Sequence, residues 1–419
     1  MTEALHQSML ERGRRARAAQ SVLAFAAPDA KNAALIETAA AIERATEEIL
    51  NLNREDIAAA HGQTSAFIDR MMLTPARVGE MSGALRNLAA RPDPVGAVLS
   101  AWERPNGLRF ERVRTPIGVI AVIYESRPAV TIDAAAIAVK AGNAVILRGG
   151  AECLATNGVL ARLFRSGLAA AGLPADALQF IETPDRAAVG HLLSGLDGAI
   201  DLVIPRGGKS LVKRVQEDAR VAVLGHLDGV CHVYLDRDAD PAKAVAVTLN
   251  SKMRRSGVCG AAETLLIDRA RLAELYPPVA RALKEAGCAL RGDAAIRLID
   301  ASAEPAGEID WSTEYLAPML SVAAVDGVEG AIAHIARYGT SHTETIVTEN
   351  MATAERFLAR VDSAIVLHNA STQFADGGEF GFGAEIGIAT GRLHARGPVG
   401  VEELTTFKTI VRGSGQVRP

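Results

Sequence analysis

The chain has 419 residues, of which 49% are hydrophobic and 22% are charged, and its formal net charge is −4 at pH 7. The apolar fraction excludes wholesale disorder, and the lack of a basic excess argues against a general nucleic-acid binder. No uninterrupted apolar stretch of about 18 residues occurs, so we expect no membrane span. We expect a cytoplasmic protein with reduced thiols, because no signal core is visible and the four cysteines form no CxxC pair.

The first hundred residues have mostly helix-like apolar spacing, which ends at residues 91–94 (RPDP) because closely spaced prolines cannot continue a helix. Residues 108–115 then alternate apolar and polar side chains, the pattern of a half-exposed strand. From residue 117 to residue 204, short apolar strands alternate with helices. This rhythm predicts a largely parallel sheet that is covered on both faces.

A second α/β region begins near Gly229 and extends to Leu367. Residues 376–400 are rich in glycine but keep an ordered apolar pattern. We expect this segment to approach a ligand or a subunit interface closely rather than to act as a flexible linker.

Three expected strand ends carry residues that suit an anionic ligand: residues 124–128 (YESRP), 148–150 (RGG) and 205–210 (PRGGKS). Ligands bind at the carboxyl ends of parallel strands, and glycine allows the backbone to approach a phosphate. The pattern is consistent with a dinucleotide, although plain strand-to-helix turns would look similar. No GxGxxG fingerprint follows a strand, and the sequence around Lys209 lacks the first glycine of a P-loop.

Cys259 lies on an expected turn, marked by Gly257 and Gly260, just before an expected strand. The nearby cations Lys252 and Arg255 favour a thiolate, which can attack a carbonyl carbon. The alternative is a buried structural cysteine. The nine histidines show neither HExxH nor Cys/His ligand spacing, so the sequence predicts no metal site.

Seven sequence motifs are distributed over nearly the whole chain. Together they resemble the γ-glutamyl phosphate reductase branch of the aldehyde dehydrogenase superfamily. They are residues 93–96 (DPVG), 118–128 (GVIAVIYESRP), 140–150 (KAGNAVILRGG), 204–210 (IPRGGKS), 226–232 (HLDGVCH), 256–267 (SGVCGAAETLLI) and 369–412.

The resemblance implies an α/β fold with two parallel-sheet domains and a small β oligomerisation flap. The cofactor-binding domain would span residues 1–228, with a flap strand near 108–115, and the catalytic domain residues 229–368. Residues 369–419 would return to the interface and the flap. A homo-oligomer, either a dimer or a tetramer, follows from this architecture.

The implied reaction is the NADPH-dependent reduction of L-glutamyl 5-phosphate to L-glutamate 5-semialdehyde through a cysteine thioester, the second step of proline biosynthesis. The alternative is a related NAD(P)-dependent acyl-phosphate or aldehyde dehydrogenase with a different small-molecule substrate. The reductase pattern uses the whole chain, so the glutamate 5-kinase that makes the substrate would be a separate protein. Because the substrate is labile, this kinase would form a transient complex with the reductase.

The resemblance also assigns site residues. Cys259 is the nucleophile, and its backbone N–H and the Ser126 hydroxyl are candidate oxyanion donors. The cofactor residues are Arg148, Gly207, Gly208, Lys209 and Glu314, and the substrate residues are Arg127, Lys252, Arg255 and Arg396. Arg148 replaces a lysine that usually approaches the adenosine ribose, and arginine there would accept a 2′-phosphate, which implies NADPH. Glu314 corresponds to the glutamate that holds the nicotinamide ribose.

One difference from hydrolytic aldehyde dehydrogenases concerns the general base. These enzymes carry a glutamate in a Glu-Leu-Gly-Gly stretch, where this chain has residues 226–229 (HLDG). Without the base that activates water, a thioester would survive long enough to exchange with phosphate.

Overall fold

The computed structural model describes residues 3–418, which divide into two compact units. The first unit comprises the chain up to Gly225, together with Gly381–Gly387 and the chain from Val399 onward. The second unit comprises His226–Phe380 and Ile388–Pro398. The glycine-rich segment therefore contributes to both units.

Five helices precede the first strand of the first unit. They are α1 (Glu3–Leu23), α2 (Pro28–Arg44), α3 (Thr46–Ala59), α4 (Ser65–Met71) and α5 (Pro75–Ala89). Pro28 and Pro75 begin their helices, where the missing N–H would have no intrahelical partner in any case. The Thr64 and Thr74 side chains cap α4 and α5 by accepting backbone N–H groups. Helix α2 packs against α5 and the later helix α7 (Leu154–Ala170).

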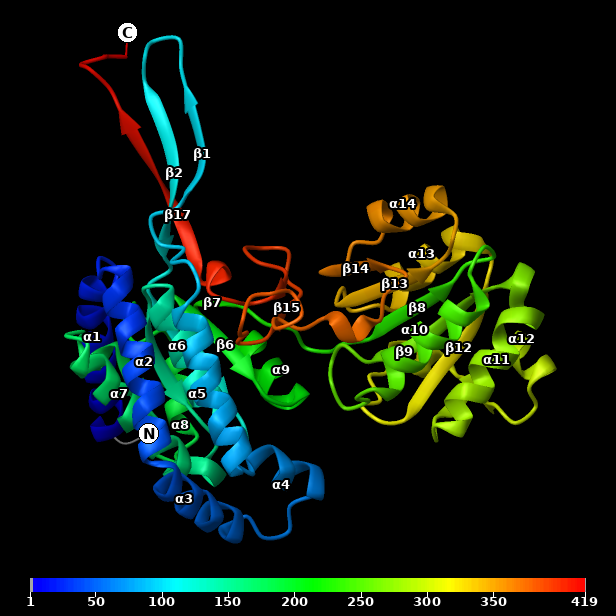
Figure 1. Ribbon diagram of the computed structural model, residues 1–419, viewed down its shortest axis with the longest axis horizontal. Coiled ribbons are helices and arrows are strands. Elements are labelled where there is room, and N and C mark those ends of the chain that lie inside the picture. The colour runs from blue at the N-terminus through cyan, green and yellow to red at the C-terminus, as the bar shows by residue number, and fades with distance from the viewer. Residues whose placement is uncertain (1–2, 419) are drawn as a thin grey trace. The chain divides into compact units, whose positions relative to one another are not determined.

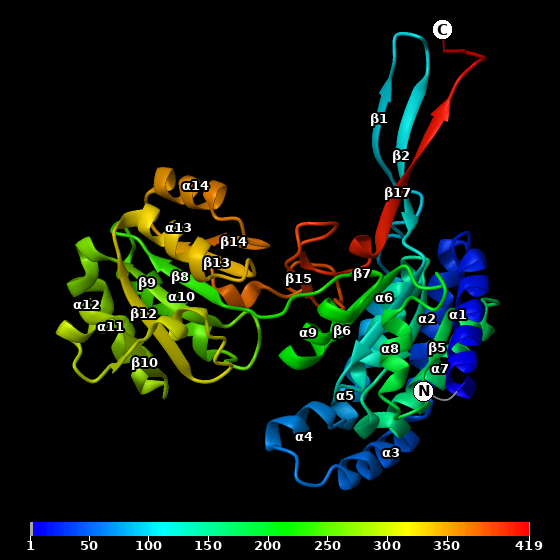
Figure 2. The same cartoon turned by 180° about the vertical axis from the view of Figure 1, so that it is seen from behind.

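A parallel sheet of five strands, in the order β5-β4-β3-β6-β7, forms the centre of the first unit. The strands are β3 (Val119–Tyr124), β4 (Ala144–Arg148), β5 (Leu178–Phe180), β6 (Leu202–Arg206) and β7 (Ala222–Val223), joined by α6 (Ala129–Lys140), α7 (Leu154–Ala170), α8 (Ala187–Leu193) and α9 (Lys209–Asp218). Every residue of β3 and β4 is buried, as parallel strands covered on both faces require. Helices α2 and α5 are in the foreground of Figure 1, whereas α1 and α8 are in the foreground of Figure 2.

A small antiparallel sheet projects from the parallel sheet of the first unit (Figure 1). It contains β1 (Val98–Glu103), β2 (Arg109–Pro116) and β17 (Thr405–Arg412), in the order β1-β2-β17. Trp102 pairs with Phe110 across β1 and β2, and their rings stack with centroids 5.2 Å apart. The Arg112 guanidinium lies over the rings of Trp102 and Phe407, so all three strands share one aromatic and cationic cluster.

The second unit contains a parallel sheet of seven strands, in the order β11-β10-β12-β9-β8-β13-β14. The strands are β8 (Cys231–Leu235), β9 (Ala262–Asp268), β10 (Ala289–Gly292), β11 (Glu304–Pro305), β12 (Met319–Val325), β13 (Thr343–Val347) and β14 (Ile365–His368). The helices are α10 (Pro241–Met253), α11 (Leu272–Glu285), α12 (Ala294–Ile299), α13 (Gly327–Tyr338) and α14 (Met351–Arg360). A short antiparallel pair, β15 (Ile388–Ala389) and β16 (Gly397–Pro398), completes this unit.

Two apolar cores cover the faces of the seven-stranded sheet. On one face, Val233 and Leu265 pack with Leu275 and Leu283 of α11. On the other face, the alternate residue Tyr234 packs with buried side chains of α13 and α14, such as Phe357. Figures 1 and 2 show the same arrangement, with α10, α11 and α12 on one side and α13 and α14 on the other. Period-2 alternation along each strand therefore fills both cores.

The α/β fold with parallel sheets and a small antiparallel sheet is confirmed. The expected strand at 108–115 corresponds to β2. The helical region ends close to residues 91–94, as expected, because α5 stops at Ala89, but strand β1 (Val98–Glu103) was not predicted. All six β1 residues are exposed, so this strand lacks the one-sided apolar pattern that sequence reasoning needs. Within residues 3–418, no helix is long and apolar enough to cross a membrane.

Candidate active site

A cavity of about 500 Å³ opens at the carboxyl ends of β3 and β4 in the first unit. The strand order of this sheet reverses between β3 and β6, and open α/β sheets bind ligands at such a point. Tyr124, Glu125 and Ser126 line the cavity at the end of β3, and Arg148 lines it at the end of β4. Two of the three strand ends selected from the sequence therefore meet at one cavity, and Ser210 contributes from the third.

Three arginines, Arg148, Arg186 and Arg214, line this cavity. Arg148 donates to the carbonyl oxygens of Gly149 at 2.9 Å and Pro184 at 3.3 Å. Its Nε atom has no hydrogen-bond partner within residues 3–418. Burial lowers the pKa of the Arg148 guanidinium; Glu152 opposes this shift, and the nearby charges of Arg186 and Arg214 add to it. Neighbouring cations with an unused donor fit an anionic ligand group.

At the glycine turn before α9, the Glu125 carboxylate occupies a backbone N–H group that could otherwise bind an anionic ligand. The backbone N–H of Gly208 donates to Glu125 Oε2 at 2.8 Å. A Cβ atom on Gly207 would lie 2.5 Å from the same oxygen, so any other residue at this position would have to displace the Glu125 side chain. Gly207, Gly208 and Lys209 are all exposed at the start of α9, and Glu125 occupies the helix N-terminus where the sequence predicted a phosphate.

Ser126 has a positive φ of 43° and is buried. Its backbone N–H and its hydroxyl both donate to Glu152 Oε1, at 2.9 and 2.8 Å. The hydroxyl proton is therefore engaged with a carboxylate rather than presented to an oxyanion. The neighbouring Arg127 is exposed, as a substrate-binding residue requires.

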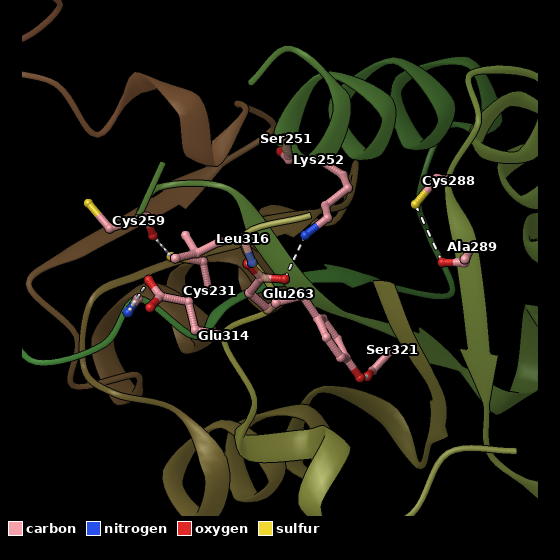
Figure 3. A network of polar contacts seen from close by, with 12 residues as sticks. Cys231, Ser251, Lys252, Cys259, Glu263, Cys288, Ala289, Glu314, Leu316 and Ser321 are labelled. Atoms are coloured by element: carbon pink, nitrogen blue, oxygen red, sulfur yellow. Dashed lines mark hydrogen bonds and ion pairs between the residues drawn. The ribbon is translucent and has the colours of Figure 1, made fainter. Parts of the chain in front are cut away.

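In the second unit, Cys259 lies on the turn between α10 and β9 and is only half-buried. Its sulfur points away from Cys231, while its carbonyl oxygen accepts from the Cys231 thiol at 3.1 Å (Figure 3). Burial raises the pKa of the other three cysteines, Cys153, Cys231 and Cys288, and brings that of Cys288 to about 11. Cys259 is thus the only described cysteine that is not fully buried.

Gly229 connects Glu314 with the cysteine turn. Glu314 Oε1 accepts from the Gly229 backbone N–H at 2.9 Å (Figure 3). A Cβ atom on Gly229 would lie 2.2 Å from the Cys259 carbonyl oxygen. Only glycine therefore allows the segment before β8 to pack against the turn that carries Cys259.

Two histidines lie beside Cys259. One ring nitrogen of His226, one of His342 and the Cys259 sulfur all lie within 4.8 Å of one another. The rings of the two histidines meet edge to face, with centroids 4.9 Å apart. His226 Nδ1 donates to the Ile388 carbonyl at 2.6 Å, so Nε2 of the neutral ring carries a lone pair. Sequence reasoning did not bring these three residues together, because they precede three different strands and share no spacing.

The remaining predicted substrate residues of the second unit have different environments. Lys252 is fully buried, and its ammonium points to Glu263 and donates to Oε2 at 2.6 Å (Figure 3). This burial favours a structural role over the substrate contact suggested by the sequence. Arg255 is exposed. Arg396 donates to Asp362 Oδ1 at 2.6 Å, and it shares this carboxylate with Arg392.

Comparisons with known proteins agree on the family. Residues 5–293 match the model described as the aldehyde dehydrogenase family. A γ-glutamyl phosphate reductase from Caulobacter sp. (strain K31) is 60% identical over 417 residues, which cover 99% of this chain and 100% of the relative. The protein of that name from Brucella suis biovar 1 (strain 1330) is 56% identical over 420 residues, with 100% of both chains covered.

A solved structure extends this agreement to the fold. The crystal structure of γ-glutamyl phosphate reductase from Thermotoga maritima matches with a TM-score of 0.96 at 42% identity, covering 98% of this chain and 100% of that one. An acetylating aldehyde dehydrogenase from Geobacillus thermoglucosidasius shares only the fold, with a TM-score of 0.68 at 19% identity and coverage of 99% and 98%. The chain belongs to the aldehyde dehydrogenase family and, within it, to the γ-glutamyl phosphate reductases.

Proposed function

We propose that this chain reduces L-glutamyl 5-phosphate to L-glutamate 5-semialdehyde and phosphate with NADPH, the second step of proline biosynthesis. The identity of 56–60% to γ-glutamyl phosphate reductases over nearly the full length supports this function more than any other observation. The half-buried Cys259 supplies a nucleophile of the required kind.

In the proposed reaction, the Cys259 thiolate bonds to the acyl carbon of the substrate, and the carbon–oxygen bond to phosphate breaks. NADPH, when bound, supplies the hydride that reduces the resulting thioester. The thiohemiacetal then re-forms a carbonyl as its carbon–sulfur bond breaks, which releases the semialdehyde and regenerates the thiolate. The backbone N–H of Cys259 is our preferred oxyanion donor, because the Ser126 hydroxyl would first have to leave Glu152.

His226 lies where hydrolytic members of the superfamily carry their glutamate. Its Nε2 lone pair, set by the Nδ1–H bond to Ile388, suits it to hold the thiol proton of Cys259. An imidazole in this role replaces the carboxylate that would activate water. This arrangement supports transfer of the acyl group to and from phosphate rather than hydrolysis.

The cavity of the first unit fits the adenosine end of the cofactor. Aldehyde dehydrogenases bind NAD(P), and the three arginines around the cavity favour the form with a 2′-phosphate. Arg148 is our first candidate for this contact, because its Nε is an unused donor. Gly207, Gly208 and Lys209 would contact the diphosphate if Glu125 turned away, and Glu314 would hold the nicotinamide ribose.

The substrate carries phosphate and α-carboxylate charges, which require cationic partners. The exposed residues Arg127 and Arg255 are our leading candidates. Arg396 follows, because it is bonded to Asp362, and Lys252 is last, because it is fully buried.

The antiparallel sheet supports a homo-oligomer, either a dimer or a tetramer. Both edge strands, β1 and β17, lack a further neighbour among the described residues. Val98, Trp102 and Phe407 are 55%, 40% and 48% exposed, and apolar side chains beside open strand edges are typical of interfaces. A transient complex with a glutamate 5-kinase and a cytoplasmic location stay predictions.

Initial rates in the reverse direction test this function. The assay supplies glutamate semialdehyde, phosphate and NADP⁺, and follows NADPH by absorbance; parallel assays replace phosphate with coenzyme A, or the semialdehyde with simple aldehydes. We expect rapid, phosphate-dependent turnover of the semialdehyde only. Preference for coenzyme A or for another aldehyde would support the alternative, a related dehydrogenase with a different substrate.

A further inference from the structure

The His226, Cys259 and His342 side chains form a cluster that the proposed reaction uses only in part. His342 directly precedes β13 and is fully buried. Its Nδ1 lies 2.9 Å from Thr343 Oγ1 and 3.5 Å from Cys231 Sγ. Its Nε2 is buried and has no hydrogen-bond partner within residues 3–418. A fully buried ring nitrogen without a partner costs free energy unless a ligand satisfies it.

The contacts around His342 are satisfied by the tautomer whose Nε2 can take a ligand, because an Nδ1–H can donate to Thr343 Oγ1 at 2.9 Å or to Cys231 Sγ at 3.5 Å. The Cys231 thiol donates its single proton to the Cys259 carbonyl at 3.1 Å, so its sulfur is free to accept from His342 Nδ1. With the proton on Nδ1, the lone pair of His342 lies on Nε2. His226 has the same tautomer, because its Nδ1–H donates to Ile388. In each ring, Nε2 therefore carries the lone pair, and a hydrogen bond from Nδ1 to a neighbouring group orients the ring. Histidine ligands in protein metal sites are held in the same way.

We propose that His226, Cys259 and His342 form a binding site for Zn²⁺, which coordinates the Cys259 thiolate and reversibly blocks catalysis. One thiolate and two neutral imidazoles suit Zn²⁺ better than Mg²⁺ or Ca²⁺, which prefer oxygen ligands. Zn²⁺ holds sulfur at about 2.3 Å and nitrogen at about 2.0 Å, so its ligand atoms lie roughly 3–4 Å apart. The three atoms here lie within 4.8 Å of one another, so movement of about 1 Å closes the site.

Coordination displaces the thiol proton to solvent and leaves the sulfur lone pair bonded to the metal, so that it cannot attack the acyl carbon. Three protein ligands leave a fourth position for water. Binding depends only on the three side chains, whereas the inhibition rests on the proposed function.

Cobalt titration of the untagged, full-length chain in phosphate-free buffer tests the site, because Co²⁺ reports a thiolate ligand by a charge-transfer band. We expect one Co²⁺ per chain, a thiolate band, and loss of that band on addition of Zn²⁺. Cys259→Ser should abolish the band, and His226→Gln should weaken binding at least tenfold, since even outer-shell changes cost about 10–100-fold. His342→Gln should have a similar effect; if it does not fold, the other two variants decide the outcome.

Matched controls are Cys288→Ser, another cysteine of the second unit, and His368→Gln, a half-buried histidine of that unit. Both should bind Co²⁺ as the unmodified chain does. Binding without a thiolate band, or binding that survives Cys259→Ser unchanged, would overturn the site. Zn²⁺ should also inhibit the reductase assay, with recovery on addition of EDTA. An inactive chain that still shows the band would count against the proposed function and leave the site intact.

Discussion

The candidate functional residues of the two parallel sheets lie at different edges: at the carboxyl edge in the first unit and at the amino-terminal edge in the second. In the first unit, Ser126 and Arg148 lie at the carboxyl ends of β3 and β4, around the point where the strand order reverses. In the second unit, His226, Cys259 and His342 all precede the strands β8, β9 and β13, at the amino-terminal edge. The rule that ligands bind at carboxyl strand ends therefore locates only one of the two sites.

The difference follows from what each edge supplies. The carboxyl edge of the first sheet offers arginines and a helix N-terminus, which suit an anion. The amino-terminal edge of the second sheet offers a thiol and two imidazoles that are oriented by backbone and side-chain acceptors. We infer that one edge binds a charged cofactor and the other carries out the chemistry, and the predictions below test this division.

Cys259→Ala has the largest expected effect. Without the thiolate, phosphate-dependent NADPH formation should fall at least about 10³-fold, as for other covalent nucleophiles. Initial rates measured beside Cys288→Ala, which removes a fully buried thiol of the same unit, separate chemistry from folding. Full activity in the Cys259 variant would show that the amino-terminal edge of the second sheet does not carry the catalytic nucleophile.

Lys252→Met should destabilise the second unit. The Lys252–Glu263 pair joins the end of α10 to β9 on either side of the cysteine turn, and both side chains are fully buried. An unpaired buried glutamate costs about 3–5 kcal/mol of unfolding free energy, measured by denaturant unfolding. Adding Glu263→Gln should restore most of this loss. The exposed pair of Lys243 and Glu349 gives the control, since Lys243→Met should cost at most about 1 kcal/mol.

If Lys252→Met instead raised KM for the semialdehyde and left the unfolding free energy unchanged, Lys252 would be a substrate residue, as the sequence first suggested. That result would mean that residues at the amino-terminal edge bind the substrate as well as carry out the chemistry.

Gly229→Ala should lower kcat by about 10²-fold, because its new Cβ, 2.2 Å from the Cys259 carbonyl oxygen, must displace the cysteine turn. Gly391→Ala is the matched control in the same unit, because no atom lies within 4 Å of a Cβ at that position. Circular dichroism should be the same for both variants. An unaffected kcat would show that the spacing between Gly229 and Cys259 does not matter for catalysis.

Arg148→Ala should raise KM for NADP⁺ by about 10–100-fold and leave KM for NAD⁺ nearly unchanged. Loss of a charged hydrogen bond to the 2′-phosphate costs about 1.5–3 kcal/mol. The exposed Arg281 of α11 supplies the control through Arg281→Ala. Equal increases for both cofactors would place Arg148 near the diphosphate or the adenine instead.

The smallest effect concerns stability alone. Burial favours a raised pKa for Asp300, but hydrogen bonds from Lys284, Tyr276 and Ser302 outweigh it and lower the pKa. A lowered pKa stabilises the fold above the unfolded value near pH 4, and the contribution is lost as pH falls further. Asp300→Asn should therefore cost about 1–2 kcal/mol at pH 7 and progressively less in acid.

Unfolding free energies across this pH range check the prediction, with Asp326→Asn at an exposed carboxylate as the control. A constant cost at every pH would mean that the charge of Asp300 contributes nothing. Reductase activity should not change, because this network contains no residue of the Cys259 cluster or of the arginine-lined cavity.

Local sequence patterns predicted the alternation of strands and helices well, because apolar runs such as Val119–Tyr124 become fully buried strands. They failed where structure depends on distant partners. Strand β1 exists through its pairing with β2, and its own residues carry no one-sided pattern. The glycine-rich segment also gave no sign that Gly381–Gly387 belongs to the first unit and Ile388–Pro398 to the second.

The candidate site shows the same limit. Cys259 was recognisable from its glycines, its cations and the family motif. The proximity of His342 to Cys259 was not, because the two residues come together only through the neighbouring strands β13, β8 and β9. Likewise, the sequence could not show that Glu125 occupies the start of α9 or that Glu263 neutralises Lys252.

Intact-protein mass spectrometry after incubation with glutamate semialdehyde and excess NADP⁺, without phosphate, tests the central claim most directly. We predict a glutamyl adduct on Cys259 that accumulates, disappears when phosphate is added, and never forms on the Cys259→Ala variant. Continuous NADPH formation without phosphate and without an adduct would contradict the account, because water would then complete the reaction and a base that activates water, such as His226, would have to be present.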